Sequence, residues 1–249
     1  MCLILLSWQQ QPDRPLIIAA NRDEFYSRPS LAADIWPDHP QILAGRDLEH
    51  GGSWLGISRN GRFAAVTNLR EVEHSGEHSR GDLVKDFLLS EKSTADYLEQ
   101  LEAKKSIYRP FNFIGFDGHR LGYSNNNETG WQLLPPGCHA IGNIPLNSTN
   151  EKTTKGKTDM DAAVSTKADH LALLAMLQDK SPNGQHQDAF HHALSCRFVS
   201  VADFNYGTRS SSVVSRHQNG HWDFWEQRYN TNSADPNFLQ VSALNHFQI

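Results

Sequence analysis

The chain has 249 residues, of which 38 % are hydrophobic and 20 % are charged, and its formal net charge is −5 at pH 7. A chain of this length buries roughly 70–75 % of its unfolded surface, so it can build a core without disulfides or metal ions. The acidic balance excludes a typical nucleic-acid-binding protein, and the apolar start, Leu3 to Leu6, is too short for a signal peptide or a membrane span.

The first predicted element is a β-hairpin at the N-terminus. CLILLSW (2–8) and PLIIAAN (15–21) are short runs rich in Leu and Ile, and QQQPDR between them supplies a turn. With the turn centred near Pro12, antiparallel pairing sets residues whose numbers sum to about 24 opposite one another. The hairpin therefore predicts that Cys2 faces Arg22, with Asn21 and Asp23 beside it.

The remaining elements follow in an order typical of an α+β protein. The patterns predict a hairpin over 54–67 with an Asn-Gly turn, helices over 80–90 and 93–105, strands over 111–126, 137–143 and 198–204, a long helix over 159–179, a shorter helix over 186–196, and a last hairpin over 210–229. Ser93 is the expected N-cap of the second helix. No linker interrupts the pattern, so we expect a single domain, 1–249.

Cys2 is the first candidate functional residue because it directly follows the initiator methionine. Removal of Met1 would leave a thiol nucleophile and a free amine on one α-carbon. An α-amine has an unperturbed pKa of about 7.7–8.0 and can act as the base for the thiol. Asn21 and Asp23 are candidates to orient this amine, and Asn21 is also a candidate ligand-binding residue. The alternative is that Cys2 only opens a buried strand as a small hydrophobic residue.

Other polar residues supply the remaining groups that amide cleavage needs. Asn68 and Asn143, at predicted strand ends, are candidates to donate hydrogen bonds to an oxyanion. Arg22 and Arg209 are candidates to lower the thiol pKa or to bind an anionic substrate. Each Asn could instead be a simple turn residue.

No metal site is expected. HSGEH (74–78) matches an inverted zinc-protease signature, but Ser75 and Gly76 interrupt the helix that this signature requires, and a solvated loop is the simpler interpretation. The three cysteines, Cys2, Cys138 and Cys196, form no C-x-x-C pair and indicate reduced thiols in a cytoplasmic protein.

Five strings of the sequence resemble, in order, motifs of the NRDE family, which is the family of transport and Golgi organisation protein 2. They are AANRDEFYSRPS (19–30), LAGRDLEHGGSWLGISRNGRFAAVTNLRE (43–71), SRGDLVKDFL (79–88), LPPGCHAIGN (134–143) and YGTRSSSVV (206–214). The similarity runs from Cys2 to about residue 229. Because this family is similar to N-terminal-nucleophile hydrolases, the resemblance implies an α+β fold, a four-layer αββα sandwich of antiparallel sheets.

The resemblance also implies roles for individual residues. In the wider hydrolase group a leading Cys attacks carbon–nitrogen amide bonds, an Asp after the first hairpin orients the amine, and Asn residues line the oxyanion hole. Carried over by position, these roles fall on Cys2, Asp23, Asn68 and Asn143. Family members tend to carry a Pro-Trp-x-Lys segment after the residue equivalent to Asn143, and NSTNEK here retains Lys152 without the Trp.

Two functions follow from these features, with haem trafficking as the expected function and amide hydrolysis as the alternative. The family resemblance implies intracellular haem trafficking, with haem as a transported ligand and no required cofactor, and Arg22 and Arg209 would suit its propionates. The residue chemistry favours hydrolysis of a non-peptide amide by Cys2. In either case the partner is a small molecule, whether haem, an acyl compound or an amide, and the question whether the protein is an enzyme stays open.

Overall fold

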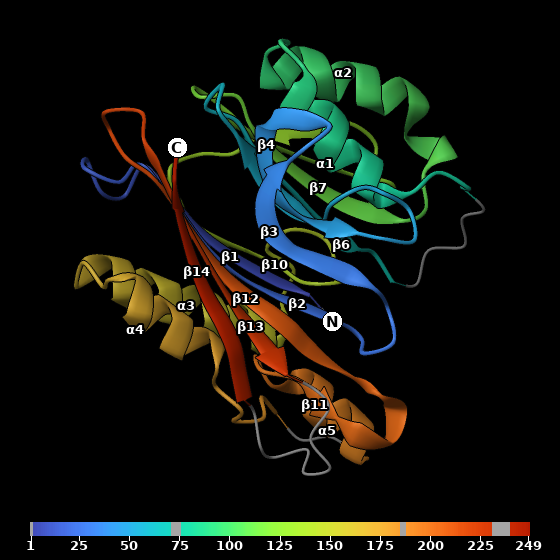
Figure 1. Ribbon diagram of the computed structural model, residues 1–249, viewed down its shortest axis with the longest axis vertical. Coiled ribbons are helices and arrows are strands. Elements are labelled where there is room, and N and C mark those ends of the chain that lie inside the picture. The colour runs from blue at the N-terminus through green and yellow to red at the C-terminus, as the bar shows by residue number, and fades with distance from the viewer. Residues whose placement is uncertain (1, 71–75, 185–187, 231–239) are drawn as a thin grey trace. The chain divides into compact units, whose positions relative to one another are not determined.

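The computed structural model describes residues 2–70, 76–184, 188–230 and 240–249. Contacts divide the chain into two compact units. The first unit comprises Met1–Ser27, Pro136–Gly142 and Asn147–Ile249, and the second comprises Arg28–Pro135 and Asn143–Leu146. Each unit has an antiparallel sheet with helices packed on it (Figure 1). That a single domain spans residues 1–249 stays a prediction.

The sheet of the first unit has the strand order β10-β1-β2-β12-β13-β14, with β11 paired to β12. Its strands are β1 (Leu3–Trp8), β2 (Leu16–Phe25), β10 (Gly137–Ile141), β11 (Ser200–Val201), β12 (Tyr206–Arg216), β13 (Trp222–Asn230) and β14 (Gln240–Gln248). The helices of this unit are α3 (Glu151–Ser165), α4 (His170–Leu177) and α5 (Ala189–Ser195), with a 3-10 turn, η2 (Ala202–Phe204). Figure 1 shows α3 and α4, in gold, beside this sheet.

The N-terminal hairpin has the predicted register. Leu3 pairs with Asn21 and Trp8 with Leu16, so the residue numbers of each pair sum to 24. Leu3 and Leu5 pack in one buried cluster with residues of α3 and α4. Because side chains alternate between the faces of a strand, Cys2 falls at a register position of the opposite face. The ladder thus delivers the N-terminal thiol to the end of β2, where Arg22 and Asp23 lie.

The second unit has a sheet of order β3-β4-β5-β6-β7-β8-β9. Its strands are β3 (Ser30–Trp36), β4 (His39–Asp47), β5 (Leu55–Ser58), β6 (Phe63–Asn68), β7 (Phe111–Phe116), β8 (Leu121–Asn125) and β9 (Trp131–Leu133), and its helices are α1 (Arg80–Leu89), α2 (Thr94–Lys104) and the 3-10 turn η1 (Lys105–Ile107). Phe87 and Leu98, from the two α-helices, pack with Phe113 of the sheet. Ser93 caps α2 as predicted, since its hydroxyl accepts a hydrogen bond from the Asp96 N–H at 3.1 Å.

The predicted long helix over 159–179 is wrong, because this region belongs to two helices. Lys167 has a φ of 54°, in the left-handed region that a helix cannot continue through. Asp169 then starts α4, where its side chain accepts from the Ala172 N–H at 2.8 Å. Helix α3 begins well before residue 159, because Asn150 caps it by accepting from the Thr153 N–H at 2.8 Å.

Several other predicted elements are confirmed in whole or in part. The hairpin over 54–67 forms β5 and β6, the 111–126 region forms β7 and β8, and the last hairpin forms β12 and β13. The 198–204 segment is only partly strand, as β11 followed by η2, and the 186–196 helix is α5, with 186 and 187 outside the described residues. The patterns missed β3, β4, β9 and β14.

None of the helices in the described ranges has the length and apolarity needed to cross a bilayer. Within those same ranges, no three His, Cys, Asp or Glu side chains come together as a metal site would require. The HSGEH string falls partly outside them, because His74 and Ser75 are not among the described residues.

Candidate functional site

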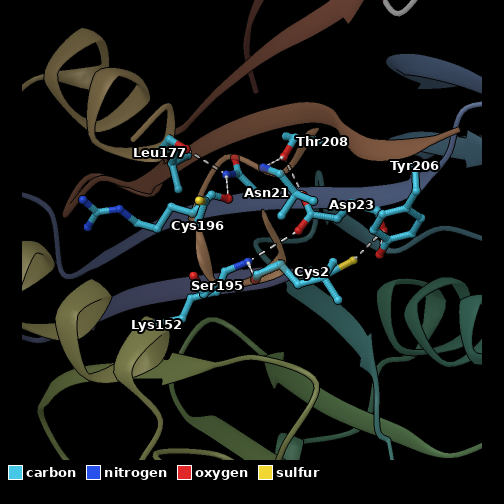
Figure 2. Close-up of polar contacts among 12 residues, drawn as sticks. Cys2, Asn21, Asp23, Lys152, Leu177, Ser195, Cys196, Tyr206 and Thr208 are labelled. Carbon is cyan, nitrogen blue, oxygen red and sulfur yellow. Dashed lines mark hydrogen bonds and ion pairs between the residues drawn. The ribbon is translucent and has the colours of Figure 1, made fainter. Parts of the chain in front are cut away.

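Strands β1 and β2 bring Cys2 and Asp23 together in the first unit (Figure 2). Cys2 Sγ donates to the backbone oxygen of Asp23 at 3.7 Å, and the Tyr206 hydroxyl donates to the same oxygen at 3.2 Å. Burial raises the pKa of the Cys2 thiol, and the Asp23 charge also raises this pKa, while the Arg22 charge lowers it. The thiol is therefore protonated at neutral pH and needs a base before it can attack.

The carboxylate of Asp23 is held in a fixed position. Its side chain is fully buried, and Asp23 Oδ1 accepts from the Thr208 hydroxyl at 2.7 Å. Asp23 Oδ2 lies 3.6 Å from Lys152 Nζ. Thr208 is itself anchored, because its Oγ1 accepts from the Val199 N–H at 2.9 Å. Thr208 and Lys152 therefore hold the Asp23 side chain in one orientation at the end of β2.

Lys152 is the site residue to which the sequence patterns assigned no role. It lies in the first turn of α3, is 6 % exposed, and its Nζ donates to the Leu194 carbonyl at 3.4 Å. Burial lowers the pKa of Lys152, and the charges of Asp23 and of a Cys2 thiolate act in the opposite direction. The only signal in the sequence is the retained Lys of the NSTNEK string, because the surrounding run EKTTKGKTD looks like a solvated surface.

Gly156 controls how closely α3 approaches β1. It follows Lys152 by one helical turn, and a Cβ at this position would lie 2.8 Å from Leu5 Cδ2. We expect Gly156→Val to push α3 off the strand and to lower the free energy of unfolding by about 1–3 kcal/mol. Urea denaturation measures this loss. Thr154→Val, on the exposed face of the same helix, is the matched control and should stay within about 0.5 kcal/mol of the wild type; equal losses in both variants would contradict the prediction.

Asn21 is completely buried, and its amide bonds to protein groups. Asn21 Nδ2 donates to the carbonyls of Leu177 and Arg197 at 2.9 Å each, and Oδ1 accepts from the Ser211 hydroxyl at 2.6 Å. These bonds tie the end of α4 and the segment before β11 to strand β2. A ligand-binding role of Asn21 stays a prediction, and its visible contacts are structural.

Arg22 and Arg209 lie at the same end of the first sheet as Cys2. Arg22 is 7 % exposed. Arg209 Nη1 donates to the carbonyls of Phe25 and Tyr26 at 3.0 Å each, which anchors its guanidinium over the end of β2. Burial lowers the pKa of Arg209, and the positive charges of Arg22 and Arg228 lower this pKa further.

Asn68 and Asn143 belong to the second unit, where they contact each other. Asn68 ends β6 and is exposed, whereas Asn143 is buried. Asn143 Nδ2 donates to the backbone oxygen of Asn68 at 2.6 Å, and the Arg70 N–H donates to the Asn143 carbonyl at 3.0 Å. Their role in an oxyanion hole stays a prediction.

The three cysteines have different surroundings. None forms a disulfide; Cys138 and Cys196 are buried, and Cys2 is half-buried. Burial, together with the nearby Asp161 carboxylate, raises the pKa of Cys138 to about 12. Burial also raises the pKa of Cys196. As a whole residue, Cys2 is therefore the most exposed of the three cysteines.

The family model and three related sequences that match this chain all belong to one family. A family model described as Transport and Golgi organisation 2 matches residues 1–231. The Transport and Golgi organization protein 2 homolog of Bos taurus is 34 % identical, over 91 % of this chain and 92 % of its own length. The Homo sapiens homolog is 31 % identical with the same coverage, and the Drosophila melanogaster protein is 28 % identical over 86 % of this chain and 87 % of its own length.

Comparison with solved structures shows the fold. A mutant of conjugated bile acid hydrolase from Clostridium perfringens matches with a TM-score of 0.58 at 10 % identity, covering 100 % of this chain and 92 % of the hydrolase. Penicillin V acylase from Agrobacterium tumefaciens matches with a TM-score of 0.50 at 12 % identity, covering 100 % of this chain and 86 % of the acylase. The likeness confirms the expected α+β fold of the N-terminal-nucleophile hydrolase type.

Proposed function

The chain belongs to the Transport and Golgi organisation 2 family, and we propose that it hydrolyses a non-peptide amide bond with Cys2 as the nucleophile. One observation carries this proposal. Thr208 and Lys152 hold the buried Asp23 carboxylate, and the Cys2 thiol bonds to the backbone oxygen of the same residue. A strand core does not need a buried ion pair at this position, since such a pair adds little net stability over apolar residues.

Because the pKa of the Cys2 thiol is raised, the reaction needs a base that removes the thiol proton. Once Met1 is removed, the amine of Cys2 lies on the same α-carbon as the thiol and has a pKa near working pH, about 7.7–8.0 when unperturbed. Asp23 accepts a hydrogen bond from this amine and sets its orientation. Lys152 Nζ, 3.6 Å from Asp23 Oδ2, helps to hold this carboxyl group in place.

The reaction then proceeds in two halves. The Cys2 amine takes the thiol proton, the sulfur attacks the amide carbon, and the oxygen becomes an oxyanion that hydrogen-bond donors must stabilise. The carbon–nitrogen bond breaks, and the leaving amine takes the proton from the Cys2 ammonium, leaving a thioester. Water then attacks the thioester while the Cys2 amine takes its proton, and the acid is released as the thiol is restored.

Release of a chromophoric amine tests this function. The protein, with Cys2 as its first residue, is incubated with N-acyl p-nitroanilides of increasing acyl length, and p-nitroaniline is followed by absorbance. We expect turnover of at least one member of the series with saturation kinetics. Release no faster than in buffer, for every member and across neutral pH, would contradict amide hydrolysis.

Haem binding and transfer is the second candidate, favoured by the proximity of a thiol and two arginines. Cys2 would supply a ligand to the iron, and Arg22 and Arg209 would bind the propionates. Titration of the protein with haem should then give a saturable Soret shift that is weakened by Arg22→Gln or Arg209→Gln. Binding that does not saturate, or that ignores both substitutions, would contradict this candidate. For either function we expect the cytoplasm as the compartment, because three scattered cysteines without a C-x-x-C pair are typical of a reducing environment.

A further inference from the structure

A row of polar side chains crosses the first sheet at the level of Cys2. Arg22 of β2 pairs with Ser210 of β12, and Ser210 pairs with Arg228 of β13. Extending the β1–β2 register by one step sets Cys2 opposite Arg22. Residues directly opposite each other in antiparallel strands share a face of the sheet. Cys2, Arg22, Ser210 and Arg228 therefore form one row, called here the arginine row.

The neighbours of this row show which face it occupies. Asn21, next to Arg22, donates to Leu177 at the end of α4. Ser211 donates to Asn21 at 2.6 Å, and the Ser211 and Tyr229 hydroxyls are hydrogen-bonded at 2.8 Å. These three residues face the helices. Because side chains alternate along a strand, the arginine row faces away from α3 and α4.

Arg209 adds a third guanidinium to the arginine row. The pairing of β12 with β2 shifts between Thr208 and Ser210, which leaves Arg209 as the extra residue of a β-bulge. The charges of Arg22 and Arg228 both lower the pKa of Arg209, and the Arg22 charge lowers the pKa of the Cys2 thiol. The effect of Arg22 on Cys2 opposes the larger effects of burial and of the Asp23 charge, which raise the pKa of this thiol.

Two carboxylates accompany the arginines. Glu24 lies two residues after Arg22 on β2, and Glu226 lies two residues before Arg228 on β13, so both occupy the face of the row. Glu24 acts on Arg209, raising its pKa against the larger effects of burial and of the two arginines. Three guanidiniums against two carboxylates leave the group with a formal positive excess, which a monovalent anion can match.

We propose that the arginine row, together with Arg209, is a subsite that binds a carboxylate or phosphate group of the substrate that Cys2 cleaves. This inference rests on the proposed hydrolase function and adds the substrate class, an amide that carries an anion. Guanidinium groups suit this task because each can present two parallel N–H donors to a carboxylate or phosphate. Arg22 and Ser210 are buried and Arg209 and Arg228 are half-buried, so water screens their interaction with an anion only in part.

The reactivity of Cys2 toward two alkylating agents tests the subsite without a known substrate. Iodoacetate carries a carboxylate and iodoacetamide does not, while both alkylate the thiolate and release iodide. A change in thiol pKa therefore cancels in the ratio of their rates. Relative to N-acetylcysteine, we expect the ratio of iodoacetate to iodoacetamide rates at Cys2 to be higher by about tenfold, as charge-assisted hydrogen bonds to an anion would give.

Substitutions assign the effect to the row. Arg22→Gln and Arg228→Gln should each bring the ratio down toward that of N-acetylcysteine, and added salt should lower it in the wild type. Arg216→Gln is the matched control, because Arg216 lies on β12 but stacks over Trp222 away from the row. A wild-type ratio equal to that of N-acetylcysteine, or one insensitive to the row substitutions, would overturn the subsite.

Calorimetry with N-acetylglycine and with inorganic phosphate separates the two anions and requires no reactive thiol. Saturable binding of the first alone assigns a carboxylate substrate, and saturable binding of the second alone assigns a phosphate. Binding of neither overturns the subsite. A Cys2 that reacts with neither alkylating agent, in a protein that still binds one of these anions, contradicts the hydrolase function and leaves the anion subsite standing.

Discussion

Replacing Cys2 with alanine will abolish the release of p-nitroaniline from every N-acyl p-nitroanilide that the protein hydrolyses, a loss on the order of 10⁴-fold or more, as when other nucleophiles are removed. The substitution deletes the attacking atom and leaves Asp23 and Lys152 in place. The measurement is kcat under saturating substrate, with mass spectrometry confirming that the Cys2→Ala chain has lost Met1 and begins with the substituted alanine.

Cys138→Ala supplies the matched control for this experiment. Cys138 is a buried thiol of the same sheet, on the β10 strand that pairs with β1. Its removal deletes one sulfur and should leave kcat within about twofold of the wild type, because surface and core changes away from the reacting atoms act mainly on stability. A Cys2→Ala protein that keeps wild-type kcat would show that another group attacks the amide.

Replacing Lys152 with methionine will slow the reaction of Cys2 and move its pH profile upward. The Lys152 ammonium lies beside the Asp23 carboxylate and interacts favourably with a Cys2 thiolate, so its loss raises the pKa of the Cys2 thiol further. Iodoacetamide labelling of Cys2 at a series of pH values reports this shift directly. Lys152→Arg keeps the positive charge and should restore most of the wild-type profile.

The same substitution will also destabilise the fold, because it removes the cation that accompanies the buried Asp23 carboxylate. Breaking one side of such a pair typically costs about 3–5 kcal/mol. Asp23→Asn combined with Lys152→Met should lose less than the sum of the two single losses, as coupled neighbours do. Lys155→Met is the control, since Lys155 is exposed and pairs with Asp159 and Asp179 at the surface. Strictly additive losses of stability would contradict the coupling of Lys152 and Asp23. A pH profile of Cys2 labelling that is the same in Lys152→Met as in the wild type would contradict the coupling of Lys152 and Cys2.

The N-terminal hairpin was predictable in full, and the physical reason is simple. Two short apolar runs around one turn allow a single register that keeps Leu3 and Leu5 on the buried face. That register alone places Cys2 beside Arg22 and Asp23. The arginine on β13 was not found, because pairing between β12 and β13 joins residues that no local pattern connects.

The sequence patterns missed elements and residues whose polar side chains take part in the fold. Strand β14 alternates between exposed and half-buried positions from residue 242 onward, but its sequence, QVSALNHFQ, does not alternate regularly between apolar and polar residues, so its place beside β13 depends on tertiary pairing. Helix α3 begins in a polar run that has no apolar stripe, and its cap at Asn150 gives the only local signal. Lys152 was overlooked for the same reason: a lysine in a charged run is normally solvated, and only the packing of α3 on β1 buries it.

A thioester-forming probe tests the central claim most directly. Two chains are compared, one with Cys2 as its first residue and one with a single alanine placed before Cys2, and each is treated with a β-lactone that acylates thiols by ring opening. We predict that the Cys2-first chain gains the mass of one lactone on Cys2, and that the extended chain stays unmodified over the same time because it lacks the α-amine base. Equal acylation of both chains would contradict catalysis by an N-terminal cysteine.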